Sequence, residues 1–140
     1  MRQSILRYFI SLLLVSLCIC SATSIFIISG SMKEDSEREM MYSVKLIEYN
    51  LNYSKDLNTQ IETLNPLAFS DDTRISVIDE KGQVLADTYK NDISSNHLKR
   101  EEVQQALHSS NHEGYAMRRS ETTNQPLLYA AYYKDNHIVR

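Results

Sequence analysis

The four histidines, His97, His108, His112 and His137, are the side chains of this chain that most readily do chemistry near neutral pH. None of them lies on a long helix in the sequence context of a phosphoacceptor. The three glycines are too few and too far apart to form a glycine-rich loop that binds a nucleotide. We therefore predict no catalytic residue in this sequence.

Two of these histidines have a spacing that metal ligands use. His108 and His112 are four residues apart, which would align both side chains on one face of a helix. The residues between them, 109–111, are typical of a loop, and a third ligand such as Glu113 has no supporting pattern. The sequence therefore predicts no metal site. Two acidic groups that could recruit divalent cations are expected to be solvated instead: the pair Asp71 and Asp72, and the segment Glu34 to Glu39.

His97 has the most informative neighbours of the four. It follows Asn96 directly before a predicted helix, where the Asn96 side chain can accept a hydrogen bond from a free backbone N–H. His97 can then bridge this loop to the sheet in a structural role. The alternative is a sensing role, as a ligand contact or a pH switch, because histidine titrates near physiological pH. The sequence leaves both interpretations open.

Residues 8–29 form the element that positions the rest of the chain. This segment has no charge and no proline, and at about 1.5 Å per residue it is long enough to cross a bilayer core of about 30 Å. Its apolar run resumes after Ser21-Ala22-Thr23, which argues against a cleaved signal peptide. We expect a single span in the cell membrane. We place residues 1–7 in the cytoplasm, because so short a tail forms no domain, and the remainder outside.

Charge and cysteine content limit the function classes. The chain has 15 basic and 18 acidic residues, and its net charge of −3 excludes the basic footprint of a nucleic-acid-binding protein. Both cysteines, Cys18 and Cys20, lie inside the apolar segment. The absence of cysteine after residue 29 is compatible with an oxidising exterior.

The hydropathy pattern after the apolar segment predicts two helices. Apolar residues from Met40 to Leu51 recur at helical spacing, and a break near 52–54 follows. Ser54 is expected to cap a shorter helix that ends before Pro66. The stripe from Met40 to Leu51 fits either a dimer seam or packing on the chain's own sheet, and the pattern does not separate the two.

From residue 73 the apolar period shortens to that of strands, with one short helix inserted. Gly82 is expected to supply the positive φ of a hairpin turn, and Gly114 to end a polar loop. The result is an α+β domain on an antiparallel sheet. The expected strands are 74–79, 83–87, 115–120, 126–133 and 137–140; the expected helix is 100–107, and the polar loop and turns are 88–96, 121–125 and 134–136.

Four short motifs follow in order: RISVIDEKGQVLAD, NHLKREEVQQAL, GYAMRRS and LLYAAYY. This ordered set resembles the extracytoplasmic sensor domain of phosphate-regulon-type sensor histidine kinases, which has a PAS-like fold of the Cache (PDC) kind. At position 101 the family often has proline, whereas this chain has Glu101, another residue suited to a helix start. The matching residues are Gly82, Val84, Leu85, Asp87, Asn96, His97, Arg100, Glu102, Val103, Gly114, Arg118, Ser120, Leu128 and Tyr129.

The resemblance implies a cytoplasmic tail (1–7), a transmembrane helix (8–29), juxtamembrane helices (30–65) and a PAS-like sensor domain (66–140) that is truncated at its C-terminal end. It implies the signal-sensing and dimerisation module of a membrane-bound two-component sensor histidine kinase. The kinase core, with its ATP, magnesium and response regulator, would lie outside these residues. We expect no cofactor here. The expected partners are the membrane, a second copy of the chain and a small-molecule or envelope signal, with no nucleic acid.

The resemblance also implies candidate site residues, because related sensors bind small anions in a pocket between sheet and helix. Since strand residues alternate, Arg118 and Arg119 cannot both face such a pocket. Arg100 is expected to be half-buried and bound to a carbonyl or to Asp87. The candidate ligand residues are His97, Arg100, Arg118 and Tyr129, and the structural motif is Gly82, Asp87, Asn96, His97 and Arg100.

The same module can serve other outputs. The alternatives are the sensor module of a chemotaxis receptor or of a cyclic-dinucleotide enzyme, or a single-pass anchored interaction domain. Nothing in these 140 residues separates these outputs from a kinase.

Overall fold

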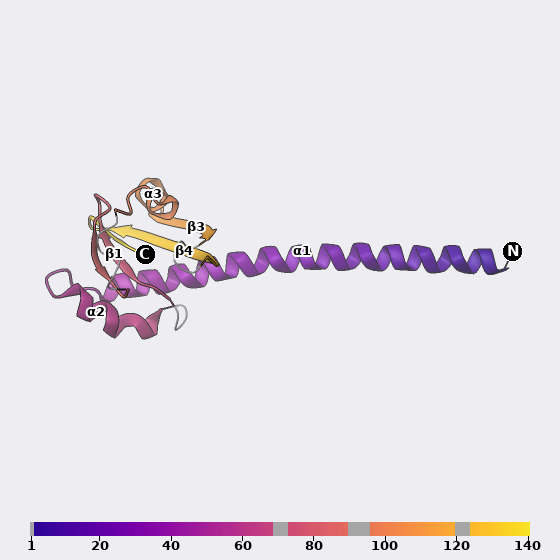
Figure 1. Ribbon diagram of the computed structural model, residues 1–140, viewed down its shortest axis with the longest axis horizontal. Coiled ribbons are helices and arrows are strands. Elements are labelled where there is room, and N and C mark those ends of the chain that lie inside the picture. The colour runs from indigo at the N-terminus through magenta and orange to yellow at the C-terminus, as the bar shows by residue number, and fades with distance from the viewer. Residues whose placement is uncertain (1, 69–72, 90–95, 120–123) are drawn as a thin grey trace. The chain divides into compact units, whose positions relative to one another are not determined.

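The computed structural model describes residues 2–68, 73–89, 96–119 and 124–140 (Figure 1). The chain divides into two compact units, Met1–Ser36 and Glu37–Arg140. Four features named from the sequence lie outside the described residues: the pair Asp71 and Asp72, Ser120, most of the loop 88–96 and most of the turn 121–125.

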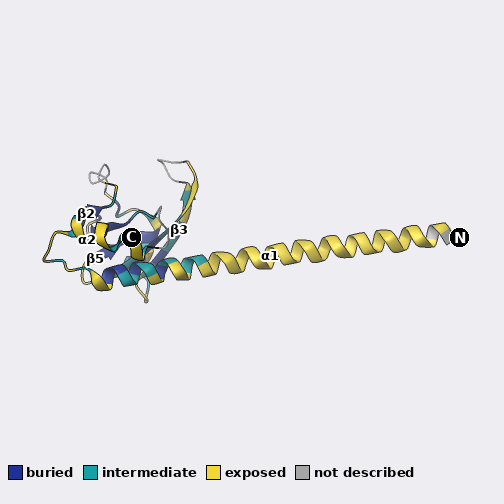
Figure 2. Ribbon diagram, turned by 90° about the horizontal axis from the view of Figure 1, so that it is seen from below, coloured by how far each residue is buried: buried dark blue, intermediate teal, exposed yellow. Residues whose placement is uncertain are grey.

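Helix α1 (Arg2–Asn50) begins in the first unit, where its apolar residues are exposed (Figure 2). By length and composition it is the one helix among the described residues that could cross a membrane. The hydroxyls of Ser11 and Thr23 donate to carbonyls three and four residues earlier in the helix. These polar side chains therefore have partners in an apolar surrounding.

The second unit contains the C-terminal part of α1 and all other elements. The predicted strands and short helix are confirmed, with ends that differ by one or two residues. The elements are α2 (Leu57–Leu64), η1 (Asn65–Leu67), β1 (Ser76–Asp79), β2 (Val84–Asp87), α3 (Glu101–His108), β3 (Glu113–Arg119), β4 (Pro126–Lys134) and β5 (His137–Val139).

The predicted break between two helices is confirmed, but its cap is a different residue. Asp56 precedes α2, and its Oδ2 accepts a hydrogen bond from the backbone N–H of Thr59 at 3.1 Å. Ser54 lies in the preceding turn, where its backbone N–H donates to Asn52 Oδ1 at 3.0 Å. The prediction of Ser54 as the cap is wrong because the Asp56 side chain is the one that reaches a free N–H in the first helical turn.

The five strands form one antiparallel sheet in the order β2-β1-β5-β4-β3. The last strand lies in the centre, since Val139 pairs with Val77 of β1 on one side and with Tyr132 of β4 on the other. The two hairpins β1–β2 and β3–β4 are thus joined only through β5. The predicted α+β class with an antiparallel sheet is confirmed.

Side-chain alternation along the strands creates a separate hydrophobic core on each face of the sheet. Ala130 and Val139 belong to the core that α1 and α2 cover. Their neighbours Ala131 and Ile138 belong to the core under α3. Figure 1 shows α3 on one side of the sheet and the C-terminal part of α1 on the other.

The apolar stripe of α1 packs on the chain's own sheet. Met41, Val44 and Ile47 are 4, 7 and 2% exposed and share a core with strands β1, β2, β4 and β5. Met40 and Leu51 pack against the same core. Of the two alternatives that the sequence left open for this stripe, the sheet contact is the one observed.

The structure requires glycine at positions 82 and 114 for different reasons. Gly82 has a φ of 81°, which confirms its predicted place in the β1–β2 turn. Gly114 lies inside β3, so its prediction as a loop end is wrong. A Cβ at Gly114 would collide with the carbonyl oxygen of Glu102 and the backbone nitrogen of Ala106. Glycine at this position lets α3 approach the strand closely.

We expect Gly114→Ala to destabilise the second unit by about 1–3 kcal/mol, because α3 must move away from β3 to admit a methyl group. Chemical unfolding of the chain in detergent micelles measures this effect. The chain has 9 tyrosines and no tryptophan, so tyrosine fluorescence follows the domain. Gly30→Ala is the matched control, because a Cβ at Gly30 meets nothing within 4 Å. Equal stability of the two variants would contradict this account.

Candidate functional site

Helix α3 buries an ionisable residue together with its apolar side. Val103 and Ala106 lie in the core beneath the helix, and Glu102 is also 0% exposed. The neighbouring Glu101 is exposed, and its carboxylate accepts a hydrogen bond from Gln105 at 3.2 Å. Although both acids lie in the first helical turn, only Glu102 faces the sheet.

Two arginines from different strands neutralise the buried carboxylate. Arg118 on β3 places its Nη2 3.0 Å from Glu102 Oε1, and Arg140, directly after β5, places its Nε 3.1 Å from the same oxygen. The Arg118 side chain is 25% exposed and the Arg140 side chain 8%. Because a buried charge is costly unless paired, this contact holds α3 against both strands.

An aromatic ring from β4 supports both guanidinium groups. The Cζ atoms of Arg118 and Arg140 lie 3.8 and 5.0 Å from the ring centroid of Tyr129. Both distances are within the range of a cation–π interaction. Tyr129 therefore adds a favourable electrostatic contact for two cations that share a single anionic oxygen.

His97 completes this arrangement from the loop before α3. Its side chain is 1% exposed, and Arg140 Nη1 lies 2.5 Å from its Nδ1. A guanidinium can only donate, so Nδ1 must accept and the ring proton must reside on Nε2. This contact requires a neutral His97, which bridges the loop to the end of β5. We call His97, Glu102, Arg118, Tyr129 and Arg140 the Glu102 cluster.

The Glu102 cluster has an excess of positive charge. Burial lowers the pKa of Arg140, and the neighbouring charges of Arg118 and Arg74 lower it further, while Glu102 opposes the shift. Among the described residues, none hydrogen-bonds the buried atoms Glu102 Oε2 and Arg118 Nε. Oε2 needs a donor and Nε needs an acceptor, and bound water can serve as either.

Asp87, a predicted motif residue, is the centre of a second buried polar network. Its carboxylate binds Arg74 through Nε at 2.9 Å and Nη2 at 2.9 Å, and it accepts from Ser76 Oγ at 2.8 Å. Arg100 is half-buried, as expected. The bidentate partner of Asp87 is Arg74. The expectation that Arg100 binds a carbonyl or Asp87 stays a prediction.

Asn96 ties the loop before α3 to the β1–β2 turn. Its Oδ1 accepts from the backbone N–H of Leu98 at 2.9 Å, as the sequence predicted for this side chain. Its Nδ2 donates to the carbonyl of Lys81 at 2.8 Å, and the backbone N–H of His97 donates to the carbonyl of Gly82 at 2.8 Å. These contacts fix the backbone that carries the His97 ring.

Strand alternation separates the adjacent arginines as predicted. Arg118 enters the Glu102 cluster, whereas Arg119 is exposed and donates to the carbonyl of Asn124 at 3.2 Å. Tyr132 and Tyr133 divide in the same way. The ring centroid of Tyr132 lies 5.1 Å from Lys45 Nζ on the α1 side. The ring centroid of Tyr133 lies 5.6 Å from that of His112.

His108 and His112 do not share a helical face. Helix α3 ends at His108, and His112 follows it with a φ of 59°. Glu113, the assumed third ligand, binds Lys45 Nζ at 2.6 Å. Within the described residues no three side chains of histidine, cysteine, aspartate or glutamate are grouped as a metal site.

Ion pairs connect α1 to the opposite face of the sheet. Lys45 binds Glu113, and Lys134 binds Glu48 at 2.8 Å. The hydrogen bond to Glu48 raises the pKa of Lys134. Burial, with the charge of Glu113, raises the pKa of Tyr115 to about 12. Lys134 therefore stays charged and Tyr115 stays neutral across the physiological pH range.

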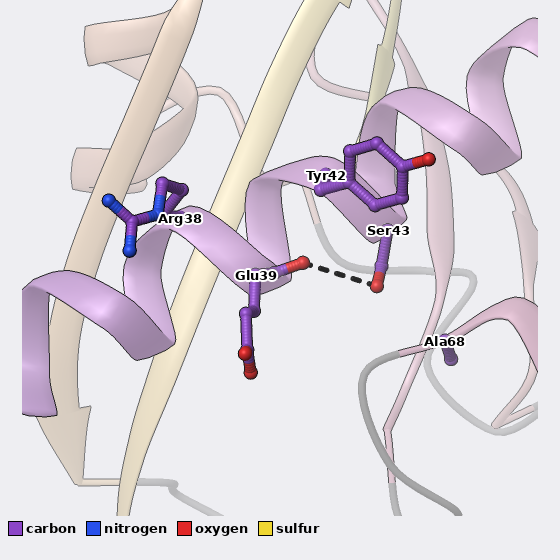
Figure 3. A pocket seen from close by; sticks show the side chains of 5 residues that line it. All are labelled: Arg38, Glu39, Tyr42, Ser43 and Ala68. Atoms are coloured by element: carbon purple, nitrogen blue, oxygen red, sulfur yellow. Dashed lines mark hydrogen bonds between the residues drawn. The ribbon is translucent and has the colours of Figure 1, made fainter.

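An open groove of about 450 Å³ runs beside α1 (Figure 3). Its lining contains no member of the Glu102 cluster. The hydroxyl of Ser43 already donates to the carbonyl of Glu39 at 3.2 Å, and Tyr42 is 70% exposed. The groove therefore offers few buried polar groups for recognition. It is lined by Arg38, Glu39, Tyr42, Ser43 and Ala68.

The structure brings three of the four predicted ligand residues together: His97, Arg118 and Tyr129. Sequence reasoning missed Arg140 and the burial of Glu102. Helical spacing could have placed Glu102 beside Ala106 on the buried side of α3. Strand alternation could have placed Arg140 on the same face as Ile138.

We expect Glu102→Ala to destabilise the domain by about 3–5 kcal/mol, because it leaves two largely buried arginines without their anion. Glu101→Ala is the matched control on the same helical turn and should cost less than about 1 kcal/mol. Thermal unfolding of the two variants in micelles measures the difference. Similar stability of both variants would show that the Glu102 cluster does not hold α3 on the sheet.

No protein-family model matches this chain, and no curated protein sequence matches it. The fold is similar to that of the Bacillus subtilis YkuI protein, a protein with an EAL domain whose crystal structure contains substrate c-di-GMP and calcium. The TM-score is 0.54 and the identity 19%, over 76% of this chain and 30% of that chain. The likeness therefore shows a shared fold, and the present chain spans about a third of that protein.

Proposed function

We propose that this chain is the membrane-anchored, extracytoplasmic signal-sensing and dimerisation module of a two-component sensor histidine kinase. The kinase core, with its ATP and magnesium, would lie outside these residues. In this proposal α1 anchors the module, residues 1–7 are cytoplasmic and the domain with the sheet is a PAS-like domain of the Cache kind.

One observation carries the proposal. Four residues from three motifs of the resemblance, His97, Glu102, Arg118 and Tyr129, meet in one buried cluster. Matches scattered by chance along a sequence have no reason to converge in space. The antiparallel five-stranded sheet and the apolar helix before it support the same proposal.

The cluster offers a chemically reasonable place for a signal to act. It lies between α3 and the sheet, where the related sensors bind small anions, and its two arginines outnumber its one carboxylate. A signal changes the domain only if it binds one arrangement of these groups better than another. On the opposite face, Lys45 and Lys134 connect the same sheet to α1, the helix that continues from the apolar segment.

A second candidate is the input module of a cyclic-dinucleotide enzyme. The observation that favours it is the fold likeness to YkuI, a protein with an EAL domain. In that case the same domain would feed an enzyme that makes or degrades a cyclic dinucleotide.

The first test is to read the gene beyond the codon for Arg140. We expect a second apolar segment, a helix with a phosphoacceptor histidine and a nucleotide-binding domain. The full-length protein in nanodiscs should then incorporate phosphate from ATP with magnesium, and Glu102→Ala should change that rate at least several-fold, whereas Glu101→Ala should not. An EAL-type or related domain would favour the second candidate. A reading frame that encodes neither output would refute both.

In this proposal the dimer uses the surface of α1 that does not pack on the sheet. Tyr42 and Tyr49 are 70 and 80% exposed, whereas Val44 is buried. In a background with Cys18 and Cys20 replaced by serine, we expect Tyr42→Cys or Tyr49→Cys to form disulfide-linked dimers in membranes. Val44→Cys is the buried control and should not. The absence of cross-linking at both tyrosine positions would contradict dimerisation along this helix.

A further inference from the structure

The contact between His97 and Arg140 can exist only while His97 is unprotonated. Arg140 Nη1 lies 2.5 Å from His97 Nδ1, and a guanidinium has no lone pair to offer in return. A proton on Nδ1 would replace this hydrogen bond by two donors that face each other. The bond is therefore sensitive to acid by its chemistry.

The charges around the ring add to this effect. Arg140 follows β5, Arg118 belongs to β3, and Arg74, before β1, is close enough to lower the pKa of Arg140. The only anion of the Glu102 cluster is Glu102 on α3, and both of its close cations share one oxygen. Tyr129 on β4 contributes a neutral ring, and Arg100 lies three residues after His97 in the same loop. Arg74 is itself paired with Asp87, which leaves two arginines and one carboxylate in the Glu102 cluster among the described residues, so a further positive charge on His97 would be unfavourable.

We propose that His97 is an acid-responsive latch: uptake of a solvent proton at Nδ1 breaks its bond to Arg140 and so removes this side-chain contact between the loop before α3 and the end of β5. The latch is a property of the fold, and its use as the signal of a sensor rests on the function proposed above. It assigns His97 the sensing role that the sequence left open beside a structural one.

The contacts of the loop define what the latch releases. The ring of His97 is held at the end of β5, while its backbone N–H donates to the carbonyl of Gly82 and the side chain of Asn96 donates to the carbonyl of Lys81, both in the β1–β2 turn. Arg140 stays in the sheet, because its backbone N–H and C=O both pair with Ser76 at 2.8 Å. Breaking the side-chain bond therefore affects the loop and the start of α3 rather than β5.

The direction of the pH dependence follows from proton uptake. A histidine exposed by unfolding or opening takes up a proton near pH 6.5, whereas the closed latch holds none. The contribution of the latch to stability is therefore complete above about pH 6.5 and is lost as the pH falls below that value. The window from pH 7.5 to 5.5 covers this change.

The matched test variant is His97→Asn in the full chain in nanodiscs. The asparagine Oδ1 can stand close to the position of Nδ1 and accept from Arg140, but it does not titrate. We expect the melting temperature of the wild type to fall by about 5 °C more than that of His97→Asn between pH 7.5 and 5.5. His108→Gln, at an exposed histidine, should keep the pH dependence of the wild type. Equal pH dependence of all three proteins would overturn the proposal.

A second measurement on the wild-type chain does not depend on any variant folding. Nitrogen-15 NMR of labelled histidine rings should show His97 as the Nε2–H tautomer at pH 7.5. On acidification its titration should coincide with shifts of the amide signals of residues 96–102. A ring that is already protonated at pH 7.5, or that titrates without these shifts, would refute the latch. Either result is independent of whether a kinase core follows, so it does not decide the proposed function.

Discussion

The cost of burying one carboxylate organises the domain. Glu102 is completely removed from solvent, and an unpaired charge in that position would destabilise the fold by several kcal/mol. Its two cations come from β3 and from the residue after β5, so the charge of Glu102 is fully paired only when both strands are in place. Gly114 permits the close approach of α3 that this pairing needs. The pairing thus couples one short helix to the centre and to one edge of the sheet.

The two faces of the sheet differ in how they hold their helices. Under α3 the polar contacts are buried, and Arg118 and Arg140 bind the same oxygen of Glu102. The other oxygen, Oε2, has no hydrogen-bond partner among the described residues. On the α1 side the ion pairs of Lys45 and Lys134 lie at the rim, where each lysine is more than 40% exposed. Solvent screens such pairs, so a change of charge there has small effects. A change of charge under α3 has large effects, which makes that face the sensitive one.

Local sequence patterns predicted most helices and strands, because these elements depend on residues that are close in the sequence. The β-branched residues of β1, the positive φ of Gly82 and the helical period of α3 each depend on near neighbours. The errors have a common cause. Ser54 and Gly114 were interpreted from their residue types alone. The helix cap depends on which side chain reaches the backbone N–H of Thr59. The need for glycine at position 114 depends on how closely α3 approaches β3. Both depend on three-dimensional placement.

The sequence by itself determined the long apolar helix, the order of helices and strands and the alternation that separates Arg118 from Arg119. Each of these follows from the 3.6- and 2-residue periods of the backbone. Only the tertiary structure decided that the stripe of α1 packs on the sheet and that Arg140 joins His97 to Glu102. His97 and Arg140 are 43 residues apart, and a contact at that separation leaves no local pattern. It arises because β5 inserts between β1 and β4, and the pairing of strands is settled by the whole domain.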